Sequence, residues 1–128
     1  MFYLLKEHNG ANNVGDFVKI MAPAGTYRLG AVVTAAGALA NGSKKAEYIC
    51  MEDKTITGDA APLYVVHVSD EMVFEAPFSG EGSLTVGTAY QFSTDGTGIT
   101  AEAATGTNNG AVVLEAPEGG KVRVKLKN

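Results

Sequence analysis

The sequence predicts an all-β protein, a single compact small barrel or sandwich of short antiparallel strands. The first observation behind this prediction is that short runs of alternating apolar and polar residues recur along the chain, which is typical of strands with one buried face. The second is that segments rich in glycine, proline and asparagine separate these runs. The third is length: 128 residues are enough for one hydrophobic core but make a second core unfavourable.

Nine alternating runs are expected to form the strands. Most have about five or six residues, the usual strand length. In chain order, they are Asp16–Ile20, Tyr27–Val33, Ala46–Met51, Leu63–Val68, Met72–Ala76, Ala89–Ser93, Ile99–Ala103, Ala111–Ala116 and Lys121–Leu126. Strand order does not follow from this spacing, because several barrels and sandwiches share it.

One segment departs from the β pattern. Thr34–Tyr48 is rich in alanine and predicts a short helix over Ala35–Ala40, ended by "NG". Gly37 interrupts this stretch, and so short a helix is only marginally stable by itself. A long loop therefore remains an equal alternative.

The domain organisation has one open point, at the N-terminus. Residues 14–128 are expected to form the single β domain, and residues 1–13 either an N-terminal arm or the first strand of the same core. The apolar residues Phe2, Tyr3, Leu4 and Leu5 precede a polar stretch, so an arm that pairs with the sheet edge of a partner is one interpretation. Packing in the chain's own core is the other.

A second apolar cluster, at Val73, Phe74, Pro77 and Phe78, leaves the same choice open. These large side chains lie beside the turn "PFSGEG". Core packing is the ordinary role of such residues, and contact with another protein is the alternative.

Charge and cysteine content exclude several functions. The net charge is −4, and no field of lysine and arginine exists that would bind the phosphates of a nucleic acid. The first apolar run, Phe2–Leu5, is shorter than the roughly 7–15 residues of a secretory signal, and no stretch reaches the roughly 20 apolar residues that cross a bilayer. Cys50 is the only cysteine, so no intrachain disulfide forms. We expect synthesis in the cytoplasm and no membrane partner.

The C-terminal basic residues alternate with apolar ones. Lys121, Arg123, Lys125 and Lys127 are separated by valine and leucine, which places the charges on one face of a strand. A solvated face is the ordinary interpretation, and a contact for an acidic partner is the alternative.

The stretch "STDGTG" around Asp95 is among the most motif-like in the chain, yet it predicts only a hairpin turn. It lacks the Gly-Lys-Ser/Thr ending of a phosphate loop, and it leads into the alternating run Ile99–Ala103 instead of a helix. Asp-Gly is favoured in tight turns because glycine accepts a positive φ. A calcium loop would need more acidic residues at fixed spacing than Asp95 alone supplies.

Metal and catalytic residues are too few and too scattered to predict an active site. His8, Cys50 and His67 are the only histidine and cysteine ligands, and they lack the spacing of a zinc site. Cys50 and His67 fall on separate predicted strands, so a nucleophile and base pair remains conceivable for a small enzyme. A buried, structural cysteine is the commoner case. We therefore expect no catalytic residue, no metal, no cofactor and no enzymatic activity.

Taken together, the elements resemble the small head decoration, or capsid cement, proteins of tailed bacteriophages and prophages. The resemblance lies in the order "VGDFVKI", "YRLGAVV", "HVSDEMVFEAPFSG", "LTVGTAYQFSTDGTGITAEA", "GAVVLEA" and "KVRVKLK". It implies a virion protein, commonly a homotrimer, which binds the outer surface of the assembled capsid through the major capsid protein and stabilises the shell. It also implies a terminal arm, for which Phe2, Tyr3, Leu4 and Leu5 are the candidates. A non-catalytic β-sandwich module that binds carbohydrate or belongs to a fibre is the alternative, although the chain has no tryptophan for a sugar platform.

Overall fold

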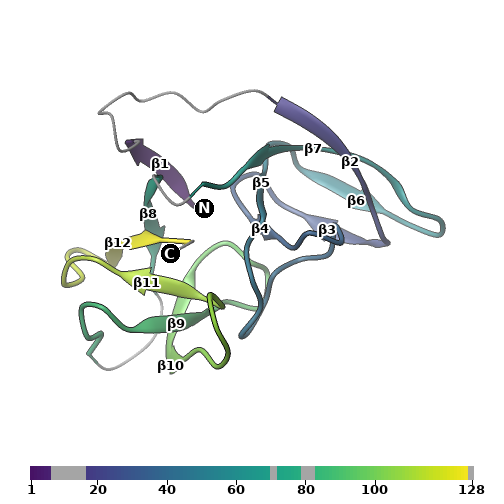
Figure 1. The fold of residues 1–128 in the computed structure, drawn as a ribbon. Helices are drawn as coiled ribbons and strands as arrows, with labels where there is room; N and C mark the ends of the chain where they lie inside the picture. The colour runs from purple at the N-terminus through teal and green to yellow at the C-terminus, as the bar shows by residue number, and fades with distance from the viewer. Residues whose placement is uncertain (7–16, 70–71, 79–82, 127–128) are drawn as a thin grey trace.

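The fold is all-β, as the sequence predicts. The computed structural model describes residues 1–6, 17–69, 72–78 and 83–126, and for Tyr3–Lys6 it describes the backbone only. Twelve strands and no helix occur in these residues, so the described chain also contains no helix able to span a membrane. The strands form three sheets in which all neighbouring strands are antiparallel (Figure 1).

The largest sheet has six strands in the order β1-β8-β12-β11-β9-β10. Their bounds are β1 Tyr3–Lys6, β8 Val73–Pro77, β12 Lys121–Lys125, β11 Ala111–Val113, β9 Ala89–Phe92 and β10 Ile99–Ala103. A single bridge between Phe78 and Ile99 brings β10 back toward the end of β8. The sheet therefore curls strongly, but one bridge does not close it into a barrel.

The second sheet has four strands and the third has two. The order of the four-stranded sheet is β2-β7-β5-β4, with bounds β2 Phe17–Ala22, β7 Ala61–His67, β5 Tyr48–Cys50 and β4 Val32–Val33. The small sheet pairs β3 Gly25–Tyr27 with β6 Lys54–Ile56. These two sheets lie together on one side of the molecule, apart from the six-stranded sheet (Figure 1).

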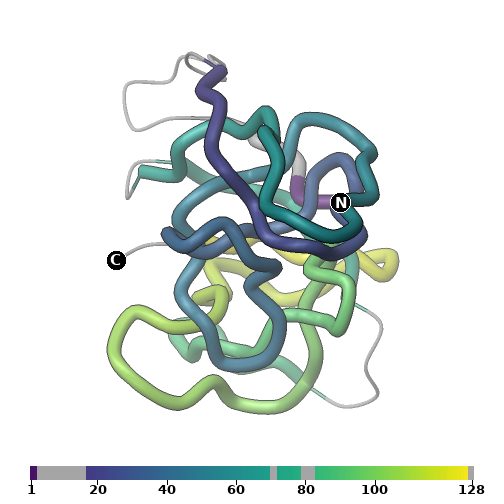
Figure 2. Tube along the Cα trace, turned by 90° about the vertical axis from the view of Figure 1, so that its right-hand side faces the viewer, coloured from purple at the N-terminus to yellow at the C-terminus, as the bar shows by residue number. Residues whose placement is uncertain are grey.

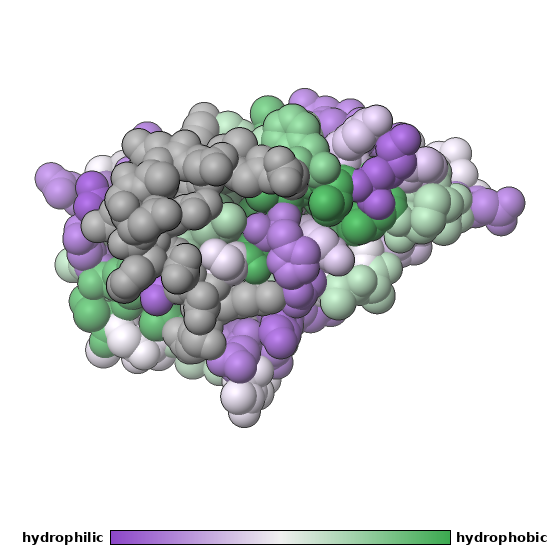
Figure 3. Space-filling view, turned by 45° about the horizontal axis from the view of Figure 1, so that its top comes forward, coloured by the Kyte–Doolittle hydropathy of each residue, from purple (hydrophilic) through white to green (hydrophobic). Residues whose placement is uncertain are grey.

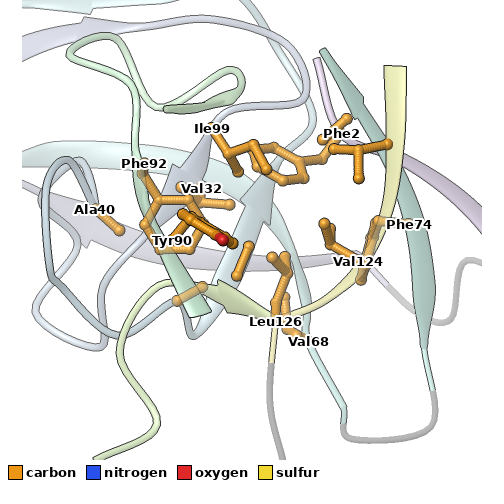
Figure 4. Packing of buried hydrophobic residues seen from close by; sticks show 14 of the residues in the cluster. Phe2, Val32, Ala40, Val68, Phe74, Tyr90, Phe92, Ile99, Val124 and Leu126 are labelled. Carbon is orange, nitrogen blue, oxygen red and sulfur yellow. The ribbon is translucent and has the colours of Figure 1, made fainter. Parts of the chain in front are cut away.

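Hydrophobic side chains pack on both faces of β5 in the four-stranded sheet. Ile49 belongs to the main core, shared with the six-stranded sheet, whereas its neighbour Cys50 belongs to a second cluster with Tyr27 and Ile56 of the small sheet. Successive residues of a strand point to opposite faces, so β5 is buried on both faces. The result is a sandwich-like arrangement in which the main core lies between the two larger sheets (Figure 4).

The loop after β4 connects the two larger sheets. Figure 2 shows this loop extending among the green segments of the six-stranded sheet. Gly42 and Phe92 exchange two backbone hydrogen bonds, with N···O distances of 3.0 and 2.9 Å, and the amide of Val32 donates to the carbonyl of Gly96 at 2.9 Å. These bonds satisfy backbone groups that would otherwise be buried without partners.

The predicted helix over Ala35–Ala40 is wrong, and the loop alternative holds. The amide of Thr34 donates to the carbonyl of Ala38 at 2.8 Å and that of Gly37 to Thr34 at 2.9 Å, which is the pattern of a tight reversal. Gly37 has a φ of +89°, a left-handed conformation that ends a helix. Its own placement explains the need for glycine, because an added Cβ would lie 2.7 Å from the carbonyl oxygen of Met21.

Each of the nine predicted runs overlaps an observed strand, with ends that differ by up to a few residues, and three further differences occur. Strand β1 is not among the nine runs, although a first strand is one of the two alternatives predicted for residues 1–13. The expected run Tyr27–Val33 divides into β3 and β4, because Gly30 has a φ of +80° and the amide of Ala31 turns back to the carbonyl of Arg28. Strand β6 was not predicted, because three residues give too short an alternation to recognise.

Candidate functional site

The N-terminal residues contact the core of the domain. Phe2 is 3% exposed, and its ring packs edge-on against Phe74 and Phe92 (Figure 4). Its amide donates to the carbonyl of Gly30 at 3.0 Å. Strand β1 then pairs with β8 in the six-stranded sheet. Phe2 therefore has the core role that the sequence left as the alternative to an arm.

The three other arm candidates lie on the edge of a sheet. Tyr3 pairs in register with Glu75, and Leu4 with Phe74, while β1 is an end strand of its sheet in the described chain. The structure describes no side chain for Tyr3, Leu4 or Leu5. A contact of these residues with a capsid remains a prediction.

The Asp95 turn is a hairpin turn, as predicted. It joins β9 to β10, which are antiparallel, and Gly96 has a φ of +73°. One carboxylate oxygen of Asp95 accepts hydrogen bonds from the Ser93 hydroxyl at 3.0 Å, the Thr97 amide at 3.1 Å and the Thr97 hydroxyl at 2.6 Å. These bonds, led by that of the Thr97 hydroxyl, lower the pKa of Asp95. The carboxylate stabilises the turn itself.

A hollow of about 710 Å³ adjoins this turn. Among the residues that the structure describes, its lining contains no aromatic side chain and no histidine or cysteine. The Asp95 carboxylate in its wall already accepts three bonds from the turn. The Asp95 carboxylate therefore serves the turn, and Arg28 is the other charged side chain in the described lining. The residues that line it are Thr26, Arg28, Leu39, Pro77, Ser93, Thr94, Asp95, Thr97 and Gly98.

Cys50 and His67 lie on adjacent strands but have separate partners. The thiol of Cys50 is fully buried and donates to the carbonyl of Glu52 at 3.0 Å, and burial raises its pKa. His67 contacts the Glu47 carboxylate at 3.4 Å and the ring of Tyr48 at 4.9 Å between centroids. A buried thiol with a raised pKa is a poor nucleophile, so this arrangement favours a structural role for Cys50.

The described residues contain no cluster of metal ligands large enough to hold an ion. No group of three or more histidine, cysteine, aspartate or glutamate side chains forms there. His8 lies outside the described residues.

The apolar segment around β8 packs mainly inward. Phe74 is buried and Phe78 half-buried against the main core, while Pro77 is exposed and Val73 is intermediate. Core packing, and not contact with another protein, therefore describes the two phenylalanines of this segment.

The basic residues of β12 alternate with buried apolar ones, as predicted. Lys121 and Arg123 are exposed, and Val122 and Val124 are buried. The Lys121 ammonium lies 3.6 Å from the Glu75 carboxylate, and the Arg123 guanidinium lies 3.6 Å from that of Glu115. These pairs leave the face mixed in charge, which favours solvent contact. Lys127 lies outside the described residues.

The most unusual surface lies on β2 and β7. Phe17 is 58% exposed, Met21 59% and Tyr64 47%. Lys19 pairs in register with Tyr64, and Met21 with Pro62, and residues opposite each other in an antiparallel pair share one face. Figure 3 shows hydrophobic surface in this region, interrupted by hydrophilic side chains. We call this surface the β2 face; its residues are Phe17, Lys19, Met21, Pro62 and Tyr64.

The other side of β2 explains why these side chains remain in solvent. Ala22 is buried and Ile20 half-buried in the second hydrophobic cluster. Because side chains alternate along a strand, Phe17, Lys19 and Met21 must point away from that cluster. Large apolar side chains grouped on one exposed face are typical of a surface that contacts another protein.

The β2 face does not follow from the sequence. The run Asp16–Ile20 predicts a strand, but "FVKIMA" has apolar residues in both alternating positions. That pattern indicates either a strand buried on both faces or one with an apolar exposed face. No local signal distinguishes the two.

Comparison with known proteins adds no family. No protein-family model matches the chain, and no curated protein matches it.

Proposed function

We propose that this protein is a structural virion protein that binds the outer surface of an assembled phage capsid through the major capsid protein and stabilises the shell. The exposed β2 face is the observation that carries the proposal, because a non-catalytic binding protein needs a surface of this kind. The order of sequence motifs, which resembles that of head decoration proteins, supplies the partner. The site of action is then the capsid exterior.

Repetition over a closed shell explains why a small contact suffices. The β2 face comprises five residues of two strands, which is small compared with a stable two-protein interface. The resemblance implies a homotrimer. Three copies of the β2 face would then bind the capsid at once, and the trimer would bind more tightly than one copy does. Sedimentation of the purified protein tests this state: the trimer is expected at three times the 13.2 kDa chain mass.

A binding assay on capsids tests the function. Expanded heads are prepared from the source phage or prophage after deletion of this gene, and the purified protein is added in increasing amounts. Saturable co-sedimentation, with an increase in the temperature at which the heads release their DNA, is the expected result. Heads that take up no protein at saturating concentration would refute the proposal.

Tyr64 favours one other function, a carbohydrate-binding or fibre-associated module. Its ring is nearly half exposed, and exposed aromatic rings stack on sugars. The Lys19 ammonium, however, lies 5.1 Å from the centroid of the same ring, in a cation–π contact that a sugar would have to displace. Binding to a glycan array, together with failure to bind heads, would favour this alternative.

A further inference from the structure

The backbone direction of β7 shows which groups of β2 remain unpaired. The amide of Tyr64 donates to the Glu52 carboxylate at 2.8 Å, and its carbonyl accepts from the amide of Met51 at 3.0 Å. Both groups therefore point toward the side of β5. In a strand, the backbone groups of successive residues point to opposite sides, so those of Leu63 and Val65 point toward β2.

The register between β7 and β2 shows which residues of β2 point their backbone groups toward β7. Ile20 pairs with Leu63 and Val18 with Val65, so Val18 and Ile20 direct their amide and carbonyl groups to β7. The amide and carbonyl groups of Phe17 and Lys19 therefore point away from β7, toward the open edge of the sheet. In the described chain β2 is an end strand of its sheet, and no backbone hydrogen bond from Phe17 or Lys19 to another segment occurs there. An open edge of this kind pairs readily with another strand.

The edge is open along one part of β2 only. Gly37 lies so close to Met21 that an added Cβ would come within 2.7 Å of its carbonyl oxygen. The loop after β4 therefore covers the strand at Met21. The pairing positions left are those of Phe17 and Lys19.

The side chains at this open edge define the chemistry of a partner. Lys19 is the only charged residue of the β2 face, and no carboxylate lies within salt-bridge distance of it in the described residues. Phe17 and Tyr64 beside it are apolar and exposed. A complementary segment therefore presents apolar side chains to Phe17 and Tyr64 and a carboxylate to Lys19.

We propose that an extended segment of the major capsid protein, with an apolar and an acidic residue two positions apart on one face, adds to β2 as a strand along Phe17–Lys19. Main-chain hydrogen bonds to Phe17 and Lys19 provide affinity, and contacts to the β2 face provide specificity. This inference rests on the proposed function and adds the place and mode of binding.

Two substitutions at Lys19 separate the contribution of its charge to binding from the contribution of its backbone amide. Lys19→Ala removes the ammonium group and should weaken binding to the gene-deleted heads about three- to tenfold. Lys19→Pro also removes the outward amide, and should weaken binding about a further tenfold. Proline is tolerated at such an edge position because that amide has no partner within the sheet. Lys45→Ala, an exposed lysine outside the β2 face, is the matched control and should bind as the wild type does.

The outcomes are distinct. If Lys19→Pro, with an unchanged melting temperature, binds as tightly as Lys19→Ala, strand addition is refuted. If both variants bind like the wild type, the β2 face has no role, although the decoration function stands. Wild-type protein that does not bind the heads refutes the decoration function, and the inference falls with it.

Hydrogen exchange of the wild-type protein tests the inference if Lys19→Pro does not fold. Binding to heads should slow exchange in a peptide covering residues 17–22 but not in one covering 121–125. Equal exchange with and without heads refutes the inference.

Discussion

The ring of Phe2 lies edge-on against the ring of Phe92, with a distance of 5.8 Å between their centroids and an angle of 76° between their planes. Phe92 ends β9, so this contact joins the start of the chain to a strand near its C-terminal part. Edge-to-face aromatic pairs add to the stability that burial provides. The first residues are consequently part of the folding unit, and the apolar side chains of the β2 face, unlike Phe2, are exposed to a partner.

Substitution of Phe2 should destabilise the protein. Phe2→Ala leaves a cavity between Phe74 and Phe92, and the free energy of unfolding should decrease by about 3–5 kcal/mol. Urea denaturation followed by circular dichroism measures it. Phe17→Ala, at an exposed phenylalanine, is the matched control and should change the free energy by about 0.5 kcal/mol or less. Equal effects of the two substitutions would contradict the core role of Phe2.

The thiol of Cys50 should be protected from alkylation in the folded protein. It is fully buried and its pKa is raised, so iodoacetamide at pH 8 should label it much more slowly than in denaturant. Mass spectrometry over time measures the rate. Rapid labelling of the folded protein would show that the thiol is accessible and would reopen a reactive role.

The same thiol should make stability decrease at alkaline pH. Below the ordinary thiol pKa of 9.0 both the folded and the unfolded state hold the proton. Above it the unfolded state loses the proton first, because the folded-state pKa is higher, and unfolding becomes more favourable. Cys50→Ala should reduce this decrease, as urea denaturation between pH 8 and 10 will show. An identical alkaline decrease in both proteins would mean that the thiol does not contribute.

Asp95 should contribute to stability at neutral pH and lose this contribution in acid. Hydrogen bonds from Thr97 and Ser93 lower its pKa, so the contribution is complete above the ordinary value of 3.8 and disappears as pH falls through the lower, folded-state value. Asp95→Ala should cost about 1 kcal/mol at pH 7. Asp95→Asn retains an acceptor oxygen and should cost less, with a weaker acid dependence. Thermal melting between pH 2 and 7 tests both, and parallel curves for wild type and Asp95→Asn would contradict the assignment.

Two glycines with similar backbone angles should differ in their tolerance of alanine. Gly110 and Gly119 have φ of +75° and +62°. A Cβ at Gly110 would overlap the carbonyl of Tyr90 and the side chain of Ala104, whereas a Cβ at Gly119 meets nothing within 4 Å. Gly119→Ala should therefore cost only the roughly 1–2 kcal/mol of a left-handed alanine, and Gly110→Ala about 1–3 kcal/mol more. Urea denaturation compares the two variants, and equal costs would show that the space around Gly110 is not restrictive.

Much of the fold follows from local sequence patterns. The alternation Lys121, Val122, Arg123, Val124 predicts a strand with one charged face, and β12 has that face. The pair Asp95-Gly96 predicts the turn between β9 and β10 for the stated reason, a positive φ at glycine. In both cases the determining interactions lie within a few residues.

Other features depend on contacts between distant segments. Gly37 prevents the helix expected over Ala35–Ala40 because its loop packs against Met21 of β2, and no local pattern contains that contact. Phe2 and Phe17 look alike in the sequence, each beginning an apolar run. Only the pairing of β1 with β8 and of β2 with β7 makes the first a core residue and the second an exposed one.

Mass spectrometry of phage particles tests the central claim most directly. The source strain is induced, particles are purified on a density gradient, and the amount of this protein is compared with that of the major capsid protein. The proposed function predicts near-stoichiometric amounts in intact particles, released by mild treatment while the shell remains assembled. Intact particles without the protein would contradict the proposed function.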